Sequence, residues 1–215
     1  MAQNTALPVR SIDHVELWVG NAKQAAYYYR KAFGFSQVAY AGPETGQRDR
    51  ASYVLKQNKI TLVLTTPLTP DHPINEHLTK HGDGVRDVAF LTDDVDACYK
   101  GAIERGATSV REPADLEDAG GKVRHAAIAT YGDTIHTFLS RGDYAGPFLP
   151  GYEANEIVEE NVGLLAVDHI VGNVEDGKMN SWIEYYESIL GFDRYVSFDD
   201  KDISTEFTAL RSQVM

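Results

Sequence analysis

The sequence predicts an α+β fold of repeated β-α-β-β-β modules, in which half-barrels pair into open barrels. The segment Ile12-Asp13-His14-Val15 returns as Val167-Asp168-His169-Ile170, an offset of 155 residues (169 − 14). After each copy, apolar residues recur at helical spacing and lead to the same dipeptide, Gly34-Phe35 and Gly191-Phe192. A fainter third copy begins at residues 87–91. This self-similarity indicates an internal structural repeat, which takes precedence over any single motif.

The first module is expected over residues 10–67. Its opening strand contains His14 and leads to a helix that ends at Gly34, where a left-handed residue is favoured. The apolar stripe of this helix is formed by Ala25, Tyr28, Tyr29, Ala32 and Phe33. Three strands complete the module, at 36–40, 51–56 and 59–65. A loop with two Gly and one Pro precedes the last two strands, which form a hairpin around Gln57-Asn58.

The second module is expected over residues 84–141. Asp93 or Asp94 caps its helix and Gly106 ends it. The buried face of the helix is formed by Val95, Cys98, Tyr99, Ala102 and Ile103. Later strands are predicted at 108–110, 123–129 and 134–139. His125 and His136 alternate with apolar residues in the last two, and we interpret each as a satisfied structural histidine.

A short helical piece is predicted at 75–80, between the two modules. His77 and His81 are four residues apart and could face one way on a helix, as paired metal ligands do. No acidic partner is evident on the helix, and Gly82 ends it beside His81. We therefore interpret both as solvated loop histidines.

A change of composition after Arg141 indicates a domain boundary. Residues 141–152 are turn-rich and residues 153–160 are acidic, so 146–163 is predicted to be a linker that proteases cut first, between 141 and 162. It follows an N-terminal domain, residues 1–145, and precedes the start of a second domain, residues 164–215, which the family resemblance described below implies to be the catalytic one. There a strand at 167–171, a helix at 180–190 and strands at 194–197 and 205–214 are expected. Because the sequence stops within the last strand, we expect this second domain to be truncated.

Charge and cysteine content exclude several classes of function. The 215 residues carry a formal net charge of −12 without a basic run, which disfavours nucleic acids and anionic membranes as partners. Cys98 is the single cysteine, so no intrachain disulfide can form, and we interpret it as a core residue. The N-terminal residues lack signal-peptide features, and no apolar run reaches membrane-spanning length. A cytoplasmic protein is expected.

His169 is a candidate metal ligand, although a single histidine on an apolar strand is more often a structural residue than a ligand. Inward-facing ligands on the opening and closing strands of paired modules would converge, and two histidines with one carboxylate leave positions on iron open for substrate and dioxygen. Asp168 should point to the opposite face by alternation and take a backbone or helix-end hydrogen bond. His14 occupies the equivalent position in the first module. The closing strands, 60–64 and 135–139, carry no central Asp or Glu, so the N-terminal domain is predicted to hold no complete metal site.

The modules resemble the vicinal oxygen chelate superfamily, and within it the 4-hydroxyphenylpyruvate dioxygenase family. Residues 167–174, Val-Asp-His-Ile-Val-Gly-Asn-Val, are similar to the metal-binding strand of that family. Residues 82–90, 146–152 and 206–212 match it as well, in the same order. The resemblance covers the whole chain. It also implies that the second histidine ligand and the glutamate ligand lie beyond residue 215.

The resemblance implies a non-haem Fe(II) dioxygenase of tyrosine degradation. Its substrates would be dioxygen and a small 2-oxo acid, 4-hydroxyphenylpyruvate, which it would convert to homogentisate and carbon dioxide. His169 would be the first iron ligand, and Ser212 and Val214 would line the substrate pocket, since alternate residues share one face of a strand. The full-length protein would be a homo-oligomer, and residues 1–215 alone would be inactive. Two alternatives remain open: 4-hydroxymandelate synthase, and a non-catalytic small-molecule-binding protein of the same superfamily.

Overall fold

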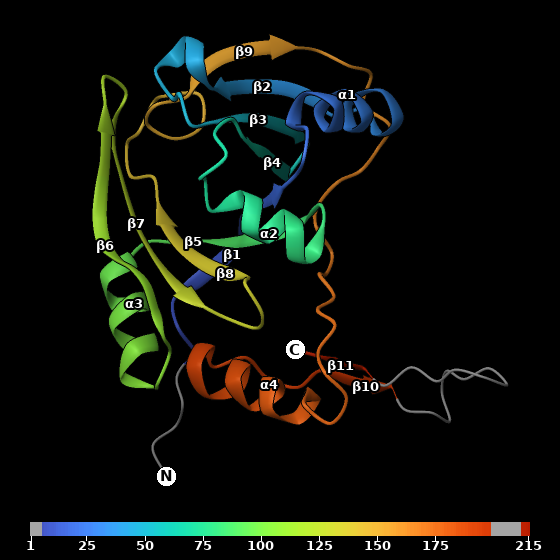
Figure 1. Ribbon diagram of the computed structural model, residues 1–215. Coiled ribbons are helices and arrows are strands. Elements are labelled where there is room, and N and C mark those ends of the chain that lie inside the picture. Colours follow the sequence, from blue (N-terminus) through green and yellow to red (C-terminus); the bar gives the residue numbers. More distant parts are fainter. Residues whose placement is uncertain (1–5, 199–211) are drawn as a thin grey trace, which may run out of the picture.

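A curved nine-stranded sheet dominates the computed structural model, which describes residues 6–198 and 212–215. Its strand order is β6-β7-β8-β5-β1-β4-β3-β2-β9 (Figure 1). The elements of the first module are β1 (Val9–Trp18), α1 (Ala22–Phe33), β2 (Ser36–Ala41), a 3₁₀ turn (Pro43–Thr45), β3 (Arg50–Gln57) and β4 (Ile60–Pro67). Those of the second are β5 (Gly84–Thr92), α3 (Val95–Glu104), β6 (Ser109–Asp118), β7 (Gly121–Ala129) and β8 (Ile135–Ser140). Between them lies α2 (Ile74–His81).

The two modules have the same topology, which confirms the predicted repeat. In each, the opening strand pairs in parallel with the last strand: β1 with β4, and β5 with β8. The remaining strands follow antiparallel, in the orders β4-β3-β2 and β8-β7-β6. The opening strands β1 and β5 then pair antiparallel with each other and join the modules into one sheet. This pairing places the histidine-bearing strand β1 near the centre of the sheet.

Gly34 ends α1 and Asp94 caps α3, as the sequence indicates, and α3 ends two residues before Gly106. Asn21 caps α1 by accepting a hydrogen bond from the Gln24 amide at 3.0 Å. For α3 the cap is Asp94, which accepts from the Ala97 amide at 2.9 Å. Gly34 ends α1 with φ +66°, and a Cβ there would lie 2.3 Å from the Glu160 carbonyl oxygen. Glycine is therefore required at position 34 by both conformation and space.

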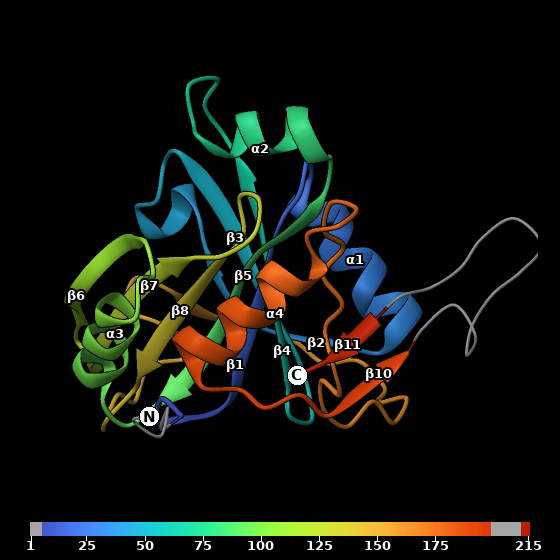
Figure 2. The ribbon, with the colours of Figure 1, turned by 90° about the horizontal axis from the view of Figure 1, so that it is seen from below.

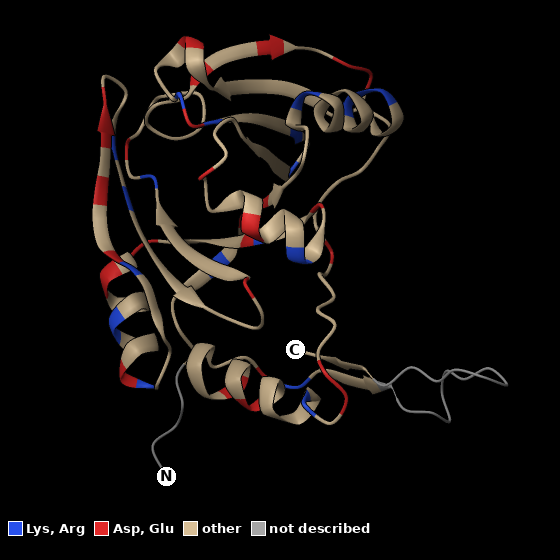
Figure 3. Ribbon diagram, in the orientation of Figure 1, with Lys and Arg blue, Asp and Glu red and all other residues tan. Residues whose placement is uncertain are grey.

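The predicted linker contains a strand that was not expected from the sequence. β9 (Glu153–Ile157) pairs antiparallel with β2 and forms one edge of the sheet. The other edge is β6, and acidic residues lie along both edge strands (Figure 3). Like charges on exposed edges disfavour pairing with a second molecule. Residues 153–157 contain few apolar side chains, which explains why the sequence pattern alone indicates a loop.

The third module is formed only in part within the described residues. The strand predicted at 167–171 is wrong, because residues 158–175 have no regular secondary structure and belong to neither described sheet. The helix predicted at 180–190 is present as α4 (Met179–Tyr185) followed directly by a π-helical turn (Tyr186–Leu190). Gly191 ends it with φ +75°, as expected. β10 (Val196–Phe198) pairs with β11 (Ser212–Val214), and the rest of the strand predicted at 205–214 lies outside the described residues.

Apolar residues of the third module pack on the second. Ile189 and Leu190 belong to one core cluster with residues of β5, β8 and α3. Figure 2 shows α4 in front of β1, β5 and β8. The Arg105 guanidinium donates to the Ile189 carbonyl at 3.0 Å, and the Leu7 amide donates to the Leu190 carbonyl at 3.0 Å. The helix of the third module therefore has a partner surface already in the N-terminal domain.

No helix in the described part of the chain has the length and apolar character needed to cross a membrane.

Candidate functional site

His169 lies on the irregular segment before α4, and its side chain is 68% exposed. Its Nδ1 atom is 2.7 Å from Asp168 Oδ2. The expectation that Asp168 takes a backbone or helix-end hydrogen bond is therefore wrong, because the carboxylate contacts the neighbouring imidazole. Alternation fails here because it applies to a paired strand, and this segment forms no ladder with a described strand.

Ser212 and Val214 lie on β11, opposite Phe198 and Val196 of β10. Both are half-buried. The cavity described below is lined by neither of them, nor by His169. The pairing of β11 with β10 accounts for their position, and their role at a substrate stays a prediction.

The described residues do not complete an iron site around His169. Among them, one group of three His, Cys, Asp or Glu side chains is close enough to share a metal ion, and it consists of His77, His81 and Asp133. A single exposed imidazole is too weak a ligand set for Fe(II), which takes two histidines and a carboxylate in sites of this type. No catalytic step through iron follows from the described geometry.

His14, at the equivalent position in the first module, is buried, and other protein groups surround its imidazole. Its Nδ1 is 2.7 Å from Asp13 Oδ2, and its ring packs edge-on against Phe148 with centroids 5.1 Å apart. Phe148 belongs to a core cluster with residues of β2, β3 and β4, so the 146–152 loop fills this half-barrel. These contacts support the predicted structural role of His14.

Two further carboxylates are held inside the sheet by hydroxyl groups. The Thr65 hydroxyl donates to Glu16 Oε1 at 2.6 Å. Asp87 accepts from the amide and the hydroxyl of Thr137. Burial raises the pKa of Asp87 to about 6, despite the opposing effects of His14 and the Thr137 hydroxyl. Each carboxylate has a protein partner, which agrees with a structural role.

His125 and His136 are buried within hydrogen-bonded surroundings, as the sequence predicts. His136 Nδ1 donates to the Val88 carbonyl at 3.0 Å, so the neutral ring accepts at Nε2 from the Tyr186 hydroxyl at 2.8 Å. His125 Nδ1 lies 3.1 Å from the Arg111 guanidinium and accepts from it. Burial lowers the pKa of both histidines to about 4, with Arg111 adding to the effect at His125. Both are neutral structural residues at pH 7.

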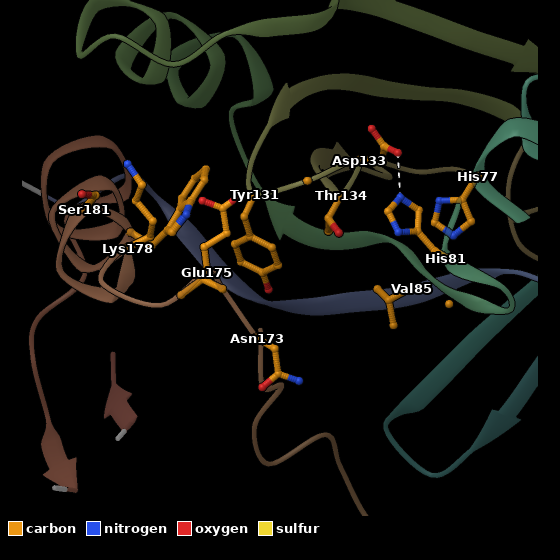
Figure 4. Close-up of a pocket in the computed structure, with 14 residues that line it drawn as sticks. His77, His81, Val85, Tyr131, Asp133, Thr134, Asn173, Glu175, Lys178 and Ser181 are labelled. Atoms are coloured by element: carbon orange, nitrogen blue, oxygen red, sulfur yellow. Dashed lines mark hydrogen bonds and ion pairs between the residues drawn. The ribbon is translucent and has the colours of Figure 1, made fainter. Parts of the chain in front are cut away.

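His77 contradicts the expectation of a solvated loop histidine. It lies on α2 and is 5% exposed, with its ring edge-on to Trp18 at 5.3 Å and 4.9 Å from the ring of His81. Burial and the nearby charges of His81 and Arg86 lower the pKa of His77. His81 itself is exposed, and its Nε2 is 2.8 Å from Asp133 Oδ2 (Figure 4). The i, i+4 spacing of the histidines was visible in the sequence.

A cavity of about 830 Å³ adjoins this histidine pair. Its lining comes from α2, from the start of β5, from the turn between β7 and β8, and from the segment around α4. Figure 4 shows the two imidazoles and Asp133 together at one end of it, and Glu175 and Lys178 toward the other. The carboxylate comes from a turn more than fifty residues away in sequence, so the pattern on α2 could not reveal it.

Comparison with known proteins identifies the family. A family model for the Glyoxalase/Bleomycin resistance protein/Dioxygenase superfamily matches residues 11–140. The chain belongs to this superfamily. The matched residues coincide with the two complete modules, β1 to β8.

The superfamily member is similar to curated 4-hydroxyphenylpyruvate dioxygenases. It is 44% identical to the one from Yarrowia lipolytica, over 96% of this chain and 55% of the relative. The protein from Xenopus tropicalis is 47% identical, over 95% of this chain and 54% of the relative. The chain thus spans about half the length of the curated relatives it matches.

A solved structure has a similar fold at lower identity. It is a mutant of 4-hydroxymandelate synthase from Streptomyces coelicolor, 31% identical, with a TM-score of 0.76 over 89% of this chain and 55% of that chain. The resemblance to 4-hydroxyphenylpyruvate dioxygenases expected from the motifs is thereby confirmed, and the sequence is more similar to those relatives than to the synthase.

Proposed function

We propose that this chain supplies the N-terminal domain and the first metal-ligand segment of a 4-hydroxyphenylpyruvate dioxygenase. The observation that carries the proposal is the identity of 44–47% to several proteins of that name across nearly the whole chain. The reaction would convert 4-hydroxyphenylpyruvate and dioxygen to homogentisate and carbon dioxide. The domain boundaries at 145 and 163, a homo-oligomeric full-length enzyme and a cytoplasmic location are parts of the same proposal.

In this proposal Fe(II) would be held by His169 together with ligands that the described residues do not contain. Iron would supply dioxygen activation. The part of this chain would be to present the His169 segment, which lies between the N-terminal domain and α4. Contacts hold the beginning of that segment: the Asn58 side-chain amide donates to the Leu164 carbonyl at 2.6 Å, and the Lys59 amide donates to the Leu165 carbonyl at 3.0 Å. Ser212 and Val214 would line the 2-oxo acid end of the pocket.

A chimeric protein tests the proposal. Residues 1–215 would be joined to the remaining C-terminal part of the Yarrowia lipolytica relative, loaded with Fe(II) and supplied with 4-hydroxyphenylpyruvate and dioxygen. We expect carbon dioxide release and homogentisate formation. The 215-residue chain alone should release no carbon dioxide. An inactive chimera with a native circular dichroism spectrum would contradict the proposal.

Two variants of the chimera separate the histidines of the repeat. His169→Ala should abolish turnover and iron retention, since one of three protein ligands is lost. The matched variant His14→Ala should keep its iron and most of its turnover, although it removes a buried side chain and should lower the melting temperature. Equal loss of iron in both variants would contradict the assignment of His169 as the ligand.

4-Hydroxymandelate synthase is the second candidate, favoured by the structural similarity to that enzyme. The resemblance implies that the synthase uses the same substrate and metal but places the oxygen differently. Product analysis on the natural enzyme that contains this chain discriminates the two functions. Homogentisate supports the first proposal, 4-hydroxymandelate supports the second, and binding of the 2-oxo acid without turnover supports a non-catalytic protein.

A further inference from the structure

We infer that His77, His81 and Asp133 form a binding site for a divalent transition-metal ion in the N-terminal domain, separate from His169. The ligand atoms of the three side chains all lie within 4.8 Å of one another. Two imidazoles and one carboxylate are a ligand set that suits Zn²⁺, Co²⁺ or Fe²⁺, whereas Mg²⁺ and Ca²⁺ prefer oxygen ligands alone.

The helix α2 places both histidines on one face. Residues four apart lie one above the other on a helix, and the two imidazole centroids are 4.9 Å apart. Asp133 reaches the pair from the turn between β7 and β8. Its backbone carbonyl accepts a hydrogen bond from the Arg86 guanidinium, which itself lies over the Trp18 ring. The carboxylate is therefore presented by an anchored turn.

The independent observation is the state of His77. Both of its ring nitrogens are buried and lack a hydrogen-bond partner among the described residues. Leaving such a polar group unpaired costs free energy, typically about 1–3 kcal/mol. The His77 ring lies next to the His81 ring, at the end of the cavity where Asp133 is also found (Figure 4). A metal ion between these side chains would give one nitrogen of His77 its missing partner.

His81 can also act as a ligand of the same metal ion. Its Nε2 is hydrogen-bonded to Asp133 Oδ2 in the absence of metal. A bound ion would replace the proton between these two atoms and release it to water, as metal binding to histidine generally does. Lys80 lies 3.9 Å from the same carboxylate oxygen and disfavours a cation, but its ammonium is also paired with Glu76 at 2.7 Å.

Tryptophan fluorescence provides a direct test on the untagged 215-residue chain. The protein has two tryptophans; Trp18 contacts the His77 ring, and Trp182 lines the adjoining cavity. After removal of metals with a chelator, titration with Co²⁺ should quench this fluorescence with a stoichiometry of one. Zn²⁺, which does not quench, should bind in competition and restore the emission. Calorimetry with Zn²⁺ gives the affinity.

Variants decide whether the site is the one inferred. Loss of a second-shell partner weakens metal sites by about 10–100-fold, so His81→Ala and Asp133→Asn, which remove ligands, should each weaken Zn²⁺ binding by at least about 100-fold. Both side chains are partly exposed, so both variants should retain the circular dichroism spectrum of the parent chain. His169→Ala should bind Zn²⁺ like the parent, which separates this site from the proposed iron ligand.

The inference is overturned by any of three results. These are the absence of saturable quenching of the parent chain below millimolar Co²⁺, Zn²⁺ binding by the two ligand variants equal to that of the parent, and loss of binding in His169→Ala alone. None of these results bears on the chimera assay above, which reads turnover and depends on His169.

Discussion

The Arg141 guanidinium forms two hydrogen bonds with the Asp13 carboxylate, Nε to Oδ1 at 2.9 Å and Nη2 to Oδ2 at 2.7 Å. The same carboxylate contacts His14, and Arg141 also donates to the Phe148 carbonyl. Arg141 directly follows the second module, whereas Asp13 lies on the opening strand of the first. This bidentate pair therefore fixes the end of the second module and the loop that fills the first half-barrel.

Asp13→Asn should lower the free energy of unfolding by about 3 kcal/mol, because it leaves a partly buried guanidinium without its charge partner. Burial alone would raise the pKa of Asp13, but hydrogen bonds from His14 and Arg141 hold it well below its ordinary value. The ion pair thus stabilises the fold above the pKa of an unfolded Asp, and this contribution is lost as pH falls toward the folded pKa. Urea unfolding at pH 7 and pH 3 measures both effects.

Asp168→Asn is the matched control for this variant. Asp168 makes the same 2.7 Å contact to its neighbouring histidine, but its side chain is 94% exposed, against 8% for Asp13. The unfolding curve should not change. If the two variants lost equal stability, the contact within the Asp-His dipeptide, and not the buried pair with Arg141, would be the stabilising feature.

The buried histidines should make the protein less stable in mild acid. The pKa of His136 is about 4 in the folded protein because of burial, and near 6.5 in an unfolded chain. Between these values the unfolded state takes up a proton that the folded state does not, so stability falls as pH falls, by up to about 1.4 kcal/mol per pH unit. Denaturation at a series of pH values should show a smaller slope for His136→Gln.

Asp87→Asn should change the same pH dependence in the opposite sense. Burial raises the pKa of Asp87 to about 6, so between pH 4 and 6 the folded state holds a proton that the unfolded state has lost. This carboxyl therefore favours folding as pH falls and partly offsets the histidines. Its removal should steepen the acid destabilisation that His136→Gln reduces. A parallel change in both variants would contradict these assignments.

Ser212→Ala tests the proposed contact with the 2-oxo acid, in the chimera. Loss of one hydrogen bond to a charged group costs about 1.5–3 kcal/mol, so kcat/KM for 4-hydroxyphenylpyruvate should fall by about 10–100-fold. Iron content should not change. Unaltered kinetics would indicate that the hydroxyl has only a structural role on β11.

Limited proteolysis should cut the chain after residue 164. The sequence alone predicts the first cut between 141 and 162, but β9 is paired with β2, and Glu159 is bound by Arg30 and Lys31 at 2.6 and 2.8 Å. Leu165 accepts a hydrogen bond from the Lys59 amide and Val167 packs against a core cluster, but residues 168–171 are exposed, belong to no described ladder, and include Ile170 and Val171. Thermolysin, which cleaves before large aliphatic residues, should therefore leave a resistant fragment ending in this segment, identified by mass spectrometry. A first cut within 146–160 would support the boundary that the sequence predicts.

The sequence by itself determined the repeat, the helices and their ends. Apolar spacing predicts α1 and α3, although Tyr28, Ala32 and Phe33 of the predicted α1 stripe are exposed, and the buried residues of α1 are Ala22 and Ala26. Asn58 at φ +49° forms the turn of the predicted hairpin, and Gly34 and Gly191 end their helices. These features depend on residues within a few positions of one another, so local periodicity and backbone preference suffice to predict them. The structural role of His14 also followed from the absence of a carboxylate on the closing strands.

Tertiary structure alone decided the features that need distant partners. β9 exists because β2 offers an unpaired edge, and the strand predicted at 167–171 does not form because no described strand lies beside it. His77 is buried because Trp18 and His81 cover it, and Asp133 joins the pair through a turn of the second module. Pairing and burial depend on which surfaces meet in space, and such contacts leave no periodic signal in the segment that they order.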